Sequence, residues 1–324
     1  MAPHLIGIDL GGTKILTARC DRDGHVEARA RDLTPQGLER VIDRMTDLVD
    51  RVLQGSDPAD LAGVGVGAPG PLEPKSGVLF GAANLPGWNR VPLRDILTAR
   101  LESRLGRAVR VVVANDANAA ALGELRFGAG RRYPGVHDLV YITIGTGIGG
   151  GIIAGGRVFA GANGMAGEIG HMTVDLNGPL CKCGNVGCVE AIAAGPAMAR
   201  AGAALVAAGR ASRLAQLAHG DPGRVTTALV EAAARSGDPD ARGVVAEAGR
   251  ALGAAVVNVL HLYNPQLVVI GGGAAKMGDL LLDPIRAAVA AHAIPAIRGD
   301  VPIVPAALGH LVGVLGAAAL VLQD

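Results

Sequence analysis

Aromatic residues are scarce in this chain of 324 residues: three phenylalanines, three tyrosines and one tryptophan make up only 2%. Half of the residues are nevertheless hydrophobic, so the core must be built from alanine, valine, leucine and isoleucine. Net charge is also nearly absent, at +1 from 30 basic and 29 acidic side chains. Without a field of one sign, we expect no global attraction to nucleic acid or to a membrane surface.

The chain also lacks clear signals for export or membrane insertion. No basic segment followed by an apolar one opens the sequence, so an oxidising compartment is not indicated. One stretch without formal charge, 306–322, is marginally short for a membrane span and is interrupted by glycines, which favours a helix packed inside the protein. We predict a soluble, cytoplasmic protein, and its length predicts about two domains.

Cysteine is rare, but three of the four cysteines lie within eight residues, at Cys181, Cys183 and Cys188, with His171 just upstream. Three thiolates and one imidazole can converge on one soft divalent metal ion, and zinc is favoured by this sulfur-rich donor set. Such a site leaves no position for water and would be structural. The alternatives are a redox disulfide, which the Cys-x-Cys spacing makes awkward, or cysteines that are merely buried. Cys20 is predicted to be a core residue.

Two carboxylates, Glu168 and Glu190, bracket the cysteine cluster. A metal ion that stiffens this loop would also hold both carboxylates in place. A stiff loop that presents carboxylates is typical of a pocket for a polar substrate.

The N-terminal part of the chain is predicted to form an antiparallel meander. Apolar runs at 5–9, 15–20 and 25–30 are separated by turn residues. Thr34 and Pro35 predict the start of a helix, as N-cap and first-turn proline, and Gly55 its end. Further strands are predicted at 64–66 and 109–114, the second buried on both faces, and a helix is predicted to begin at Asp116.

The pattern partly repeats in the second part. A strand at 139–144 is followed by a glycine-rich turn and a hairpin, helices dominate 196–264, and a last strand at 267–270 leads into three glycines. Two halves that each begin with a meander and a glycine-rich turn predict a duplicated α/β fold with a cleft between two domains. We place the domains at 1–117 and 118–306, and expect a C-terminal helix at about 307–324 to return to the first.

The glycines of the second turn, Gly145, Gly147 and Gly150, match the dinucleotide-binding pattern by spacing. That pattern requires a following helix, whereas a β-branched hairpin segment follows here, so we reject a nicotinamide site. Backbone N–H groups freed by two such turns instead predict a phosphate site, with hydroxyl donors from Thr13 and Thr146. The alternative is that they are only hairpin turns. Asp9 is suited to hold a magnesium ion, directly or through water. The three glycines at 271–273 either pack against adenine or ribose or simply turn the chain.

Asn115 and Asp116 lie where a buried strand ends and a helix begins, which is where α/β proteins place ligand-handling groups. An aspartate at this position is often only an N-cap. The functional hypothesis is a general base that accepts a proton from an attacking hydroxyl in phosphoryl transfer.

The motifs together resemble one family closely, the ROK (repressor, open reading frame, kinase) sugar kinases, and within it the bacterial glucokinases. The resemblance runs nearly end to end. Its most specific parts are the two segments that hold the histidine and the cysteines. The matching segments are 9–13, 84–88, Asn115-Asp116, 144–149, 167–171 and 181–190.

The resemblance implies an actin-like ATPase (ribonuclease-H-like) α/β fold, with two domains that close over sugar and ATP. It implies Asp116 as the base for the sugar 6-hydroxyl and a structural Zn²⁺ on His171, Cys181, Cys183 and Cys188. The hexose would be bound by Gly70, Asn84, Asn115, Asp116, Glu168, His171 and Glu190. Mg²⁺ and ATP would be held by Asp9, Gly11, Gly12, Thr13, Lys14, Gly145, Thr146, Gly147, Gly272 and Gly273.

Three functions compete. The first is an ATP-dependent hexose 6-kinase. Segment 84–88 resembles glucokinases and favours glucose as the substrate, with fructose, mannose or an N-acetylhexosamine as alternatives. The second is a sugar-sensing ROK repressor, which we disfavour because the first strand leaves no room for an N-terminal helix-turn-helix and the charge is near neutral. The third is a nucleotide-binding scaffold without catalysis, disfavoured by Asp116. We also expect a homo-oligomer, either a dimer or a tetramer.

Overall fold

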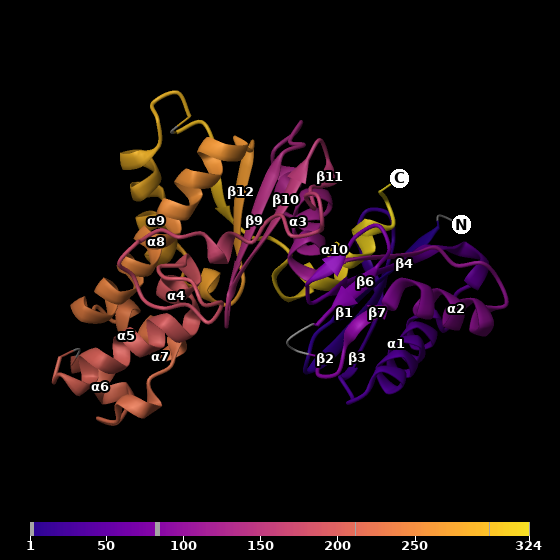
Figure 1. Ribbon diagram of the computed structural model, residues 1–324, viewed down its shortest axis with the longest axis horizontal. Helices are drawn as coiled ribbons and strands as arrows, with labels where there is room; N and C mark the ends of the chain where they lie inside the picture. Colours follow the sequence, from indigo (N-terminus) through magenta and orange to yellow (C-terminus); the bar gives the residue numbers. More distant parts are fainter. Residues whose placement is uncertain (1–2, 82–84, 211, 298, 324) are drawn as a thin grey trace. The chain divides into compact units, whose positions relative to one another are not determined.

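A computed structural model describes residues 3–81, 85–210, 212–297 and 299–323 (Figure 1). The chain divides into two compact units. Unit 1 comprises residues 1–141, 151–167 and 307–324, and unit 2 comprises residues 142–150 and 168–306. The predicted boundary near residue 118 and the cleft between domains stay predictions.

Unit 1 is built on a five-stranded sheet in the order β3-β2-β1-β4-β8. Its first three strands form the predicted antiparallel meander, and the next two add to it in parallel. Strands β5 (Leu72–Glu73), β6 (Val78–Phe80) and β7 (Asn89–Pro92) form a small separate sheet. The main strands are β1 (His4–Leu10), β2 (Lys14–Cys20), β3 (Val26–Leu33), β4 (Leu61–Ala68) and β8 (Val111–Asn115).

Helices cover both faces of this sheet because successive side chains of a strand point to opposite faces. Ile6 and Ile8 of β1 belong to a large core that includes Ile42 of α1 (Leu38–Leu53) and residues of α2 (Leu93–Leu105). On the other face, Leu5 packs with Leu315 of α10 (Val312–Leu320). Asp9 shares the parity of Leu5 and therefore lies on the α10 face.

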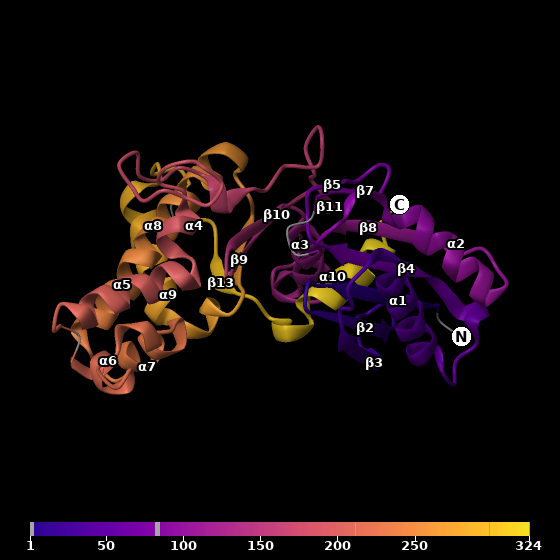
Figure 2. The same ribbon diagram turned by 60° about the horizontal axis from the view of Figure 1, so that its bottom comes forward.

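Helix α10 packs almost directly on the backbone of the sheet and of α3 (Asp116–Arg126), as Figure 2 shows in yellow. A Cβ atom added to Gly7 would lie 1.9 Å from the Val314 carbonyl oxygen, and one added to Gly65 would lie 1.8 Å from that of Ala317. Glycine is therefore required at these close approaches. Backbone-to-backbone packing of this kind fills a core without aromatic side chains.

The start of α1 differs from the sequence-based prediction. Gly37 is its N-cap residue and Leu38 its first residue, so the predicted cap at Thr34 and first-turn proline at Pro35 are wrong. Thr34 instead bonds to the turn between β1 and β2 (below). The predicted helix start at Asp116 is confirmed.

A second five-stranded sheet has the order β11-β10-β9-β12-β13, the same arrangement as the first. This repetition confirms the predicted duplicated α/β fold. The division between the units falls within β9 and β10. The strands are β9 (Leu139–Ile144), β10 (Ile148–Ala154), β11 (Arg157–Val158), β12 (Leu267–Gly271) and β13 (Ile303–Pro305).

Unit 2 is otherwise helical. Its longest helix, α8 (Pro239–Tyr263), is long and apolar enough to cross a membrane, but 56% of the tested segment is buried inside the protein. It packs against α9, α7, α4 and α5, as a core helix does. The other helices are α4 (Val189–Ala193), α5 (Gly195–Ala207), α6 (Ser212–Leu217), α7 (Thr227–Arg235) and α9 (Asp279–His292).

Short 3-10 turns complete the two units. They are η1 (Pro58–Asp60), η2 (Ala129–Arg132), η3 (Ile169–His171), η4 (Pro222–Arg224), η5 (Ala274–Met277) and η6 (Gly309–Leu311).

Candidate active site and metal centre

The end of β8 presents the candidate base in unit 1. Asn115 is the N-cap of α3, and its side-chain oxygen accepts hydrogen bonds from the N–H groups of Ala117 (2.9 Å) and Asn118 (3.3 Å). The N-cap position therefore belongs to Asn115 and not to Asp116, although Asp116 Oδ1 also accepts from the Ala117 N–H, at 2.8 Å. Asp116 is the first helical residue, where the helix dipole favours the negatively charged form of a carboxylate.

A second carboxylate, Asp9, lies close to Asp116. Burial first, and then repulsion from Asp116, raise the pKa of Asp9 to about 6, while the charge of Lys14 partly lowers it. Helix α10 packs against this carboxylate, because a Cβ added to Gly313 would lie 2.7 Å from Asp9 Oδ2. A bound cation would favour the ionised form of Asp9. Carboxylate oxygens are common ligands of Mg²⁺, so Asp9 fits the predicted magnesium ligand.

The first glycine turn connects β1 and β2 in unit 1. It is closed by a hydrogen bond from the Gly11 N–H to the Lys14 carbonyl oxygen at 3.0 Å. The Thr34 hydroxyl donates to the Gly11 carbonyl oxygen at 2.6 Å, and the Thr34 N–H donates to that of Thr13 at 3.1 Å. Two neutral hydrogen bonds from one residue thus hold this turn.

The second glycine turn connects β9 and β10 in unit 2. Here the Gly145 N–H donates to the Gly147 carbonyl oxygen at 2.8 Å, and Glu190 Oε2 accepts from the Ile148 N–H at 2.8 Å. A Cβ on Gly147 would lie 2.5 Å from that same carboxylate oxygen. Glu190, predicted as a sugar ligand, therefore also holds the second turn.

The glycines after β12 lie beside the second turn. Gly272 has φ +84°, and a Cβ there would come within 2.4 Å of the Ile144 carbonyl oxygen. Side chains are excluded both by this contact and by the backbone conformation. Space around a Cβ at Gly273 is open, with no atom within 4 Å among the described residues. The structure thus brings the second turn and the glycines after β12 together in unit 2.

The cysteine loop of unit 2 folds through tight backbone hydrogen bonds. The Cys181 N–H donates to the Asn185 carbonyl oxygen at 2.7 Å, and the Gly184 N–H to that of Cys181 at 3.0 Å. Gly187 has φ +71°, and a Cβ there would lie 1.6 Å from the Asp175 carbonyl oxygen. A bridge between Thr173 and Cys188 then places His171 next to the cysteines.

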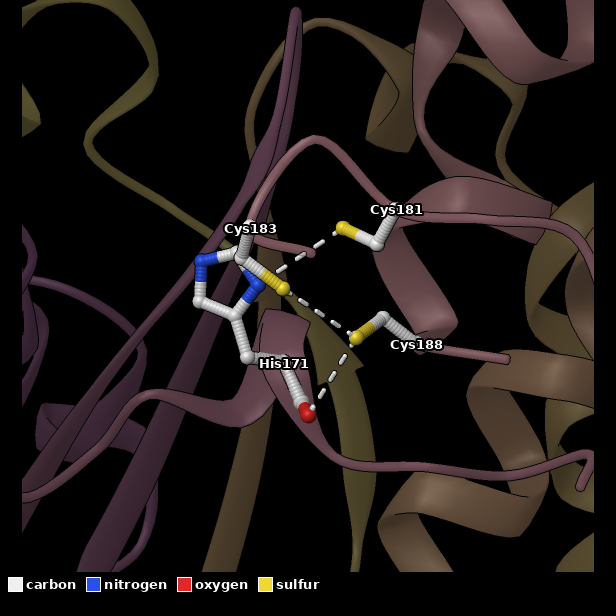
Figure 3. Close-up of side chains that lie close together, drawn as sticks. All are labelled: His171, Cys181, Cys183 and Cys188. Atoms are coloured by element: carbon white, nitrogen blue, oxygen red, sulfur yellow. Dashed lines mark hydrogen bonds between the residues drawn. The ribbon is translucent and has the colours of Figure 1, made fainter. Parts of the chain in front are cut away.

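The four predicted metal ligands converge on one point (Figure 3). Their donor atoms lie within 4.8 Å of one another, with 3.7 Å between the sulfurs of Cys183 and Cys188 and 3.9 Å from Cys181 Sγ to His171 Nδ1. Zinc–sulfur bonds of about 2.3 Å put the donors of a tetrahedron roughly 3.5–3.8 Å apart. The arrangement fits a structural Zn²⁺, and the four cysteines of the chain are all free thiols.

The environments of two metal-facing thiols differ. The backbone N–H of Asn185 lowers the pKa of Cys183, whereas burial raises the pKa of Cys188 to about 11. Cys188 also contacts Asn185 Nδ2 at 3.3 Å. A bound divalent ion would favour the thiolate form of every cysteine in the set.

Only one ring nitrogen of His171 faces the cysteines. Nδ1 faces Cys181 Sγ, and Figure 3 shows the other ring nitrogen on the side away from the sulfur atoms. Glu168 directly precedes this 3-10 turn, and its carbonyl oxygen accepts from the His171 N–H at 3.0 Å. The second ring nitrogen therefore points away from the cysteine sulfurs (Figure 3).

The sequence-predicted site residues fall into two groups, one in each unit. Asn84 lies outside the described residues, and Gly70 lies beside Asn115, since a Cβ on Gly70 would be 3.1 Å from Asn115 Nδ2. Unit 1 holds Asp9, Gly11, Gly12, Thr13, Lys14, Gly70, Asn115 and Asp116. Unit 2 holds Gly145, Thr146, Gly147, Glu168, His171, Cys181, Cys183, Cys188, Glu190, Gly272 and Gly273.

Three residues near these groups were not predicted to be site residues. Thr34 holds the first turn, Gly313 makes room for the Asp9 carboxylate, and Asn185 contacts Cys188. Asn185 alone carried a signal, because it lies inside the Cys-x-Cys-Gly-Asn-x-Gly-Cys segment. Thr34 and Gly313 contact residues that are distant in sequence, Gly11 and Asp9 respectively.

Comparison with known proteins identifies relatives over the whole chain. Residues 5–324 match the model of the ROK family. Curated glucokinases are similar, at 37% identity for Thermotoga maritima (98% of this chain, 96% of the relative) and 39% for Halalkalibacterium halodurans (98% and 95%). A xylose repressor of Caldicellulosiruptor bescii is 32% identical, over 99% of this chain and 78% of the repressor.

A solved structure agrees with these sequence relatives. The ROK glucokinase of Streptomyces griseus, in complex with glucose and AMPPNP, has a TM-score of 0.80 and 37% identity over 99% of this chain and 100% of that one. The predicted actin-like fold class is confirmed by this likeness. The chain belongs to the ROK family.

Proposed function

We propose that this chain transfers the terminal phosphoryl group of ATP to the 6-hydroxyl of glucose. The observation that carries the proposal is the likeness, along nearly the full length of both chains, to glucokinases, one of them solved with glucose and an ATP analogue. Phosphoryl transfer asks the protein mainly for alignment, charge neutralisation and one carboxylate. Residues suited to each of these tasks are present in the two units.

Asp116 is the base in this proposal. Asn115 occupies the N-cap position, and Asp116 Oδ1 shares the Ala117 N–H at 2.8 Å. Its position at the first residue of α3 favours the ionised form that accepts a proton. The sugar hydroxyl would lose its proton to this carboxylate as it attacks phosphorus. Asn115 and Gly70, which lie together, would bind neighbouring hydroxyls.

The two glycine turns would hold the nucleotide phosphates. Backbone N–H groups and the hydroxyls of Thr13 and Thr146 are donors suited to phosphate oxygens, and Lys14 adds a positive charge. Asp9 would hold Mg²⁺, which neutralises phosphate charge when bound. Gly273, open on its Cβ side, would lie against the base or ribose.

Unit 2 would contribute the remaining sugar contacts. His171, Cys181, Cys183 and Cys188 would hold a structural Zn²⁺, which fixes the orientation of the imidazole ring. The second ring nitrogen of His171 would then hydrogen-bond a sugar hydroxyl. Glu168, just before His171 in sequence, and Glu190, just after Cys188, would bind other hydroxyls. Asn84 is retained as a proposed sugar ligand on the resemblance alone.

A coupled assay of ADP production tests the activity. With ATP and Mg²⁺ we expect glucose to give the highest kcat/KM in a panel that includes mannose, fructose and N-acetylglucosamine. If another hexose gave the highest kcat/KM, glucose would be wrong as the substrate, but the chain would still be a hexose kinase. No ADP production with any hexose would refute the kinase proposal.

Asp116→Asn tests the proposed base. We expect kcat to fall by about 10²–10⁴-fold, the range for general base catalysis, because the amide cannot accept the proton. Glucose binding, measured by calorimetry, should remain. The matched control is Asp95→Asn, an acidic residue in the first turn of α2, which should keep the wild-type rate.

The likeness to a xylose repressor supports a second candidate, a sugar sensor without catalysis. Sugar binding without ATP turnover would favour it. Homo-oligomerisation, a cytoplasmic location and the absence of nucleic-acid and membrane partners stay predictions.

A further inference from the structure

Asn185 lies in the cysteine loop between Cys183 and Cys188 and contacts three of the four proposed metal ligands. Its carbonyl oxygen accepts from the Cys181 N–H at 2.7 Å, and its own N–H donates to the Cys183 sulfur. Its side-chain nitrogen, Nδ2, lies 3.3 Å from Cys188 Sγ. The first two contacts use backbone atoms, which any residue other than proline supplies. Only the contact with Cys188 requires the asparagine side chain.

The side-chain amide of Asn185 is oriented by Thr173. Nδ2 donates to the Thr173 hydroxyl oxygen at 2.8 Å and to Cys188 Sγ at 3.3 Å. An amide nitrogen carries two hydrogen atoms, so it can donate to both acceptors at once. Thr173 is also paired with Cys188 in the bridge that brings His171 to the cysteines. The hydroxyl and the sulfur therefore lie side by side, and one amide spans them.

Cys188 is the proposed cysteine ligand with the least access to water. Its exposed fraction is 0%, that of Cys181 is 3%, and Cys183 is exposed. Three thiolates and one neutral imidazole around Zn²⁺ leave one excess negative charge. Water does not reach the Cys188 sulfur, so its share of that charge has to be offset by donors from the protein.

Metal binding changes which contacts of Cys188 are hydrogen bonds. As a thiol, Cys188 Sγ donates to the His171 carbonyl oxygen at 3.5 Å. A zinc-bound thiolate has no proton and can only accept, so this contact then brings two acceptors together. Among the residues that the structure describes, Asn185 Nδ2 is the only N–H donor within hydrogen-bond distance of this sulfur. The metal-bound form therefore depends on Asn185 more than the metal-free form does.

Cys188 also connects the metal centre to the second glycine turn. Glu190 follows it by two residues, at the start of α4, and accepts from the Ile148 N–H at 2.8 Å. A side chain that fixes Cys188 therefore also fixes the segment from which Glu190 reaches the turn.

We propose that Asn185 is a positioning residue of the metal centre, whose amide donates to the Cys188 thiolate and so raises the affinity of the site for zinc. Partners of this kind, which contact the ligands and not the ion, typically change metal affinity by about 10–100-fold. The inference rests on the structural Zn²⁺ of the proposed function. It does not rest on kinase activity, because metal binding is measured without glucose or ATP.

The first measurement is the zinc affinity of the full-length protein, from competition with a chromophoric chelator. For Asn185→Ala we expect an affinity about 10–100-fold weaker, because the buried thiolate loses its donor. Asn185→Asp has nearly the same shape but places a second negative charge beside the sulfur, so its loss should be larger. Asn185→Gln keeps the amide donor and should recover part of the affinity. The matched control is Asn177→Ala, at an exposed asparagine of the same loop, which should bind zinc as wild type does.

The second measurement is the absorption spectrum after zinc is replaced by Co²⁺, which separates a donor to sulfur from a residue that only supports the loop. A hydrogen bond to a thiolate lowers the energy of its lone pairs. Losing it should therefore move the sulfur-to-cobalt charge-transfer band of Asn185→Ala to longer wavelength. The d–d bands of tetrahedral cobalt should keep their intensity, because all four ligands remain. Asn177→Ala should leave the whole spectrum unchanged, and circular dichroism checks that each variant is folded.

Zinc affinity of Asn185→Ala within about threefold of wild type, or an equal loss in Asn177→Ala, would overturn the proposal. A weaker affinity with an unmoved charge-transfer band would also overturn it, since Asn185 would then act on the loop and not on the sulfur. Wild-type protein that binds no zinc would overturn the metal centre itself together with this inference. An inactive kinase whose zinc affinity still falls with Asn185→Ala would contradict the proposed function and support the positioning role.

Discussion

The two glycine turns have similar sequences but are held by different chemistry. In unit 1, the turn at Gly11 is held by the hydroxyl and N–H of Thr34, and the nearby carboxylate of Asp9 is buried with a raised pKa. In unit 2, the carboxylate of Glu190 itself accepts a hydrogen bond from Ile148 at the turn. One carboxylate thus lies in an environment that disfavours its charge, and the other is engaged by a backbone donor.

This difference also decides which turn is connected to the metal centre. Glu190 lies two residues after Cys188, at the start of α4, so the cysteine loop and the second turn share a short rigid segment. Thr34 lies in the loop before α1, in the other unit. We therefore expect metal removal to loosen the second turn and to leave the first unchanged.

Loss of the metal should give the largest difference between the two turns. Cys183→Ser removes one of four ligands, and we expect loss of bound zinc and a fall in kcat/KM for glucose of at least about tenfold. Hydrogen exchange should become faster at the Ile148 N–H and stay unchanged at the Gly11 N–H. Lys182→Ala, in the same loop but without a donor for zinc, is the control. Unchanged kcat/KM for glucose in a zinc-free variant would show that the metal does not support the sugar site.

Asp9→Asn should affect stability and activity in opposite directions. The folded pKa of Asp9, about 6, lies above its ordinary value of 3.8, so the neutral form stabilises the fold below pH 3.8 and this contribution is lost as pH rises through 6. Asparagine stays neutral, and at pH 7.5 without Mg²⁺ the variant should be about 1–3 kcal/mol more stable than wild type. The two proteins should converge near pH 4, measured by urea unfolding.

Activity of the same variant should be lost, because a neutral amide is a poor magnesium ligand. Equal stability of variant and wild type at pH 7.5 would contradict a strained Asp9 carboxylate. Asp95→Asn again provides an exposed control, with no change expected in either measurement.

Glu190→Ala examines the second turn directly. The Ile148 N–H would lose its acceptor, which costs about 1–3 kcal/mol for a buried donor. We expect faster exchange at Ile148 and a higher KM for both ATP and glucose. Glu190→Gln keeps an oxygen acceptor, so exchange at Ile148 should stay slow while glucose binding weakens. Equal exchange in both variants would show that the carboxylate does not hold the turn.

Local patterns were enough to predict much of this molecule. Alternating apolar runs predict the meander of unit 1, and the strand-to-helix junction predicts the start of α3 at Asp116. The spacing of Cys181, Cys183 and Cys188 predicts a cluster that the fold does assemble. Each of these signals lies within a few residues of sequence, where local geometry decides the structure.

The failures have a common cause in long-range contacts. Thr34 followed by proline resembles a helix start, but its hydroxyl bonds to Gly11, which is 23 residues away in sequence. Glu190 accepts from Ile148 across 42 residues. Gly313 was not predicted to matter for the site, yet Asp9 lies against it. Such partners are set by tertiary packing and have no local signature.

Thr34→Val should have the smallest effect and shows most directly how the first turn is held. Valine has a similar shape but lacks the hydroxyl donor to the Gly11 carbonyl oxygen, while the Thr34 N–H bond to Thr13 remains. Losing one such bond costs about 1 kcal/mol, so we expect the KM for ATP to rise about fivefold with kcat and the KM for glucose unchanged. Thr98→Val, which removes a hydroxyl bond of 2.7 Å within α2, is the matched control. A rise in the KM for glucose alone would mean that Thr34 supports the sugar rather than the phosphate turn, and the contrast between the two turns would fail.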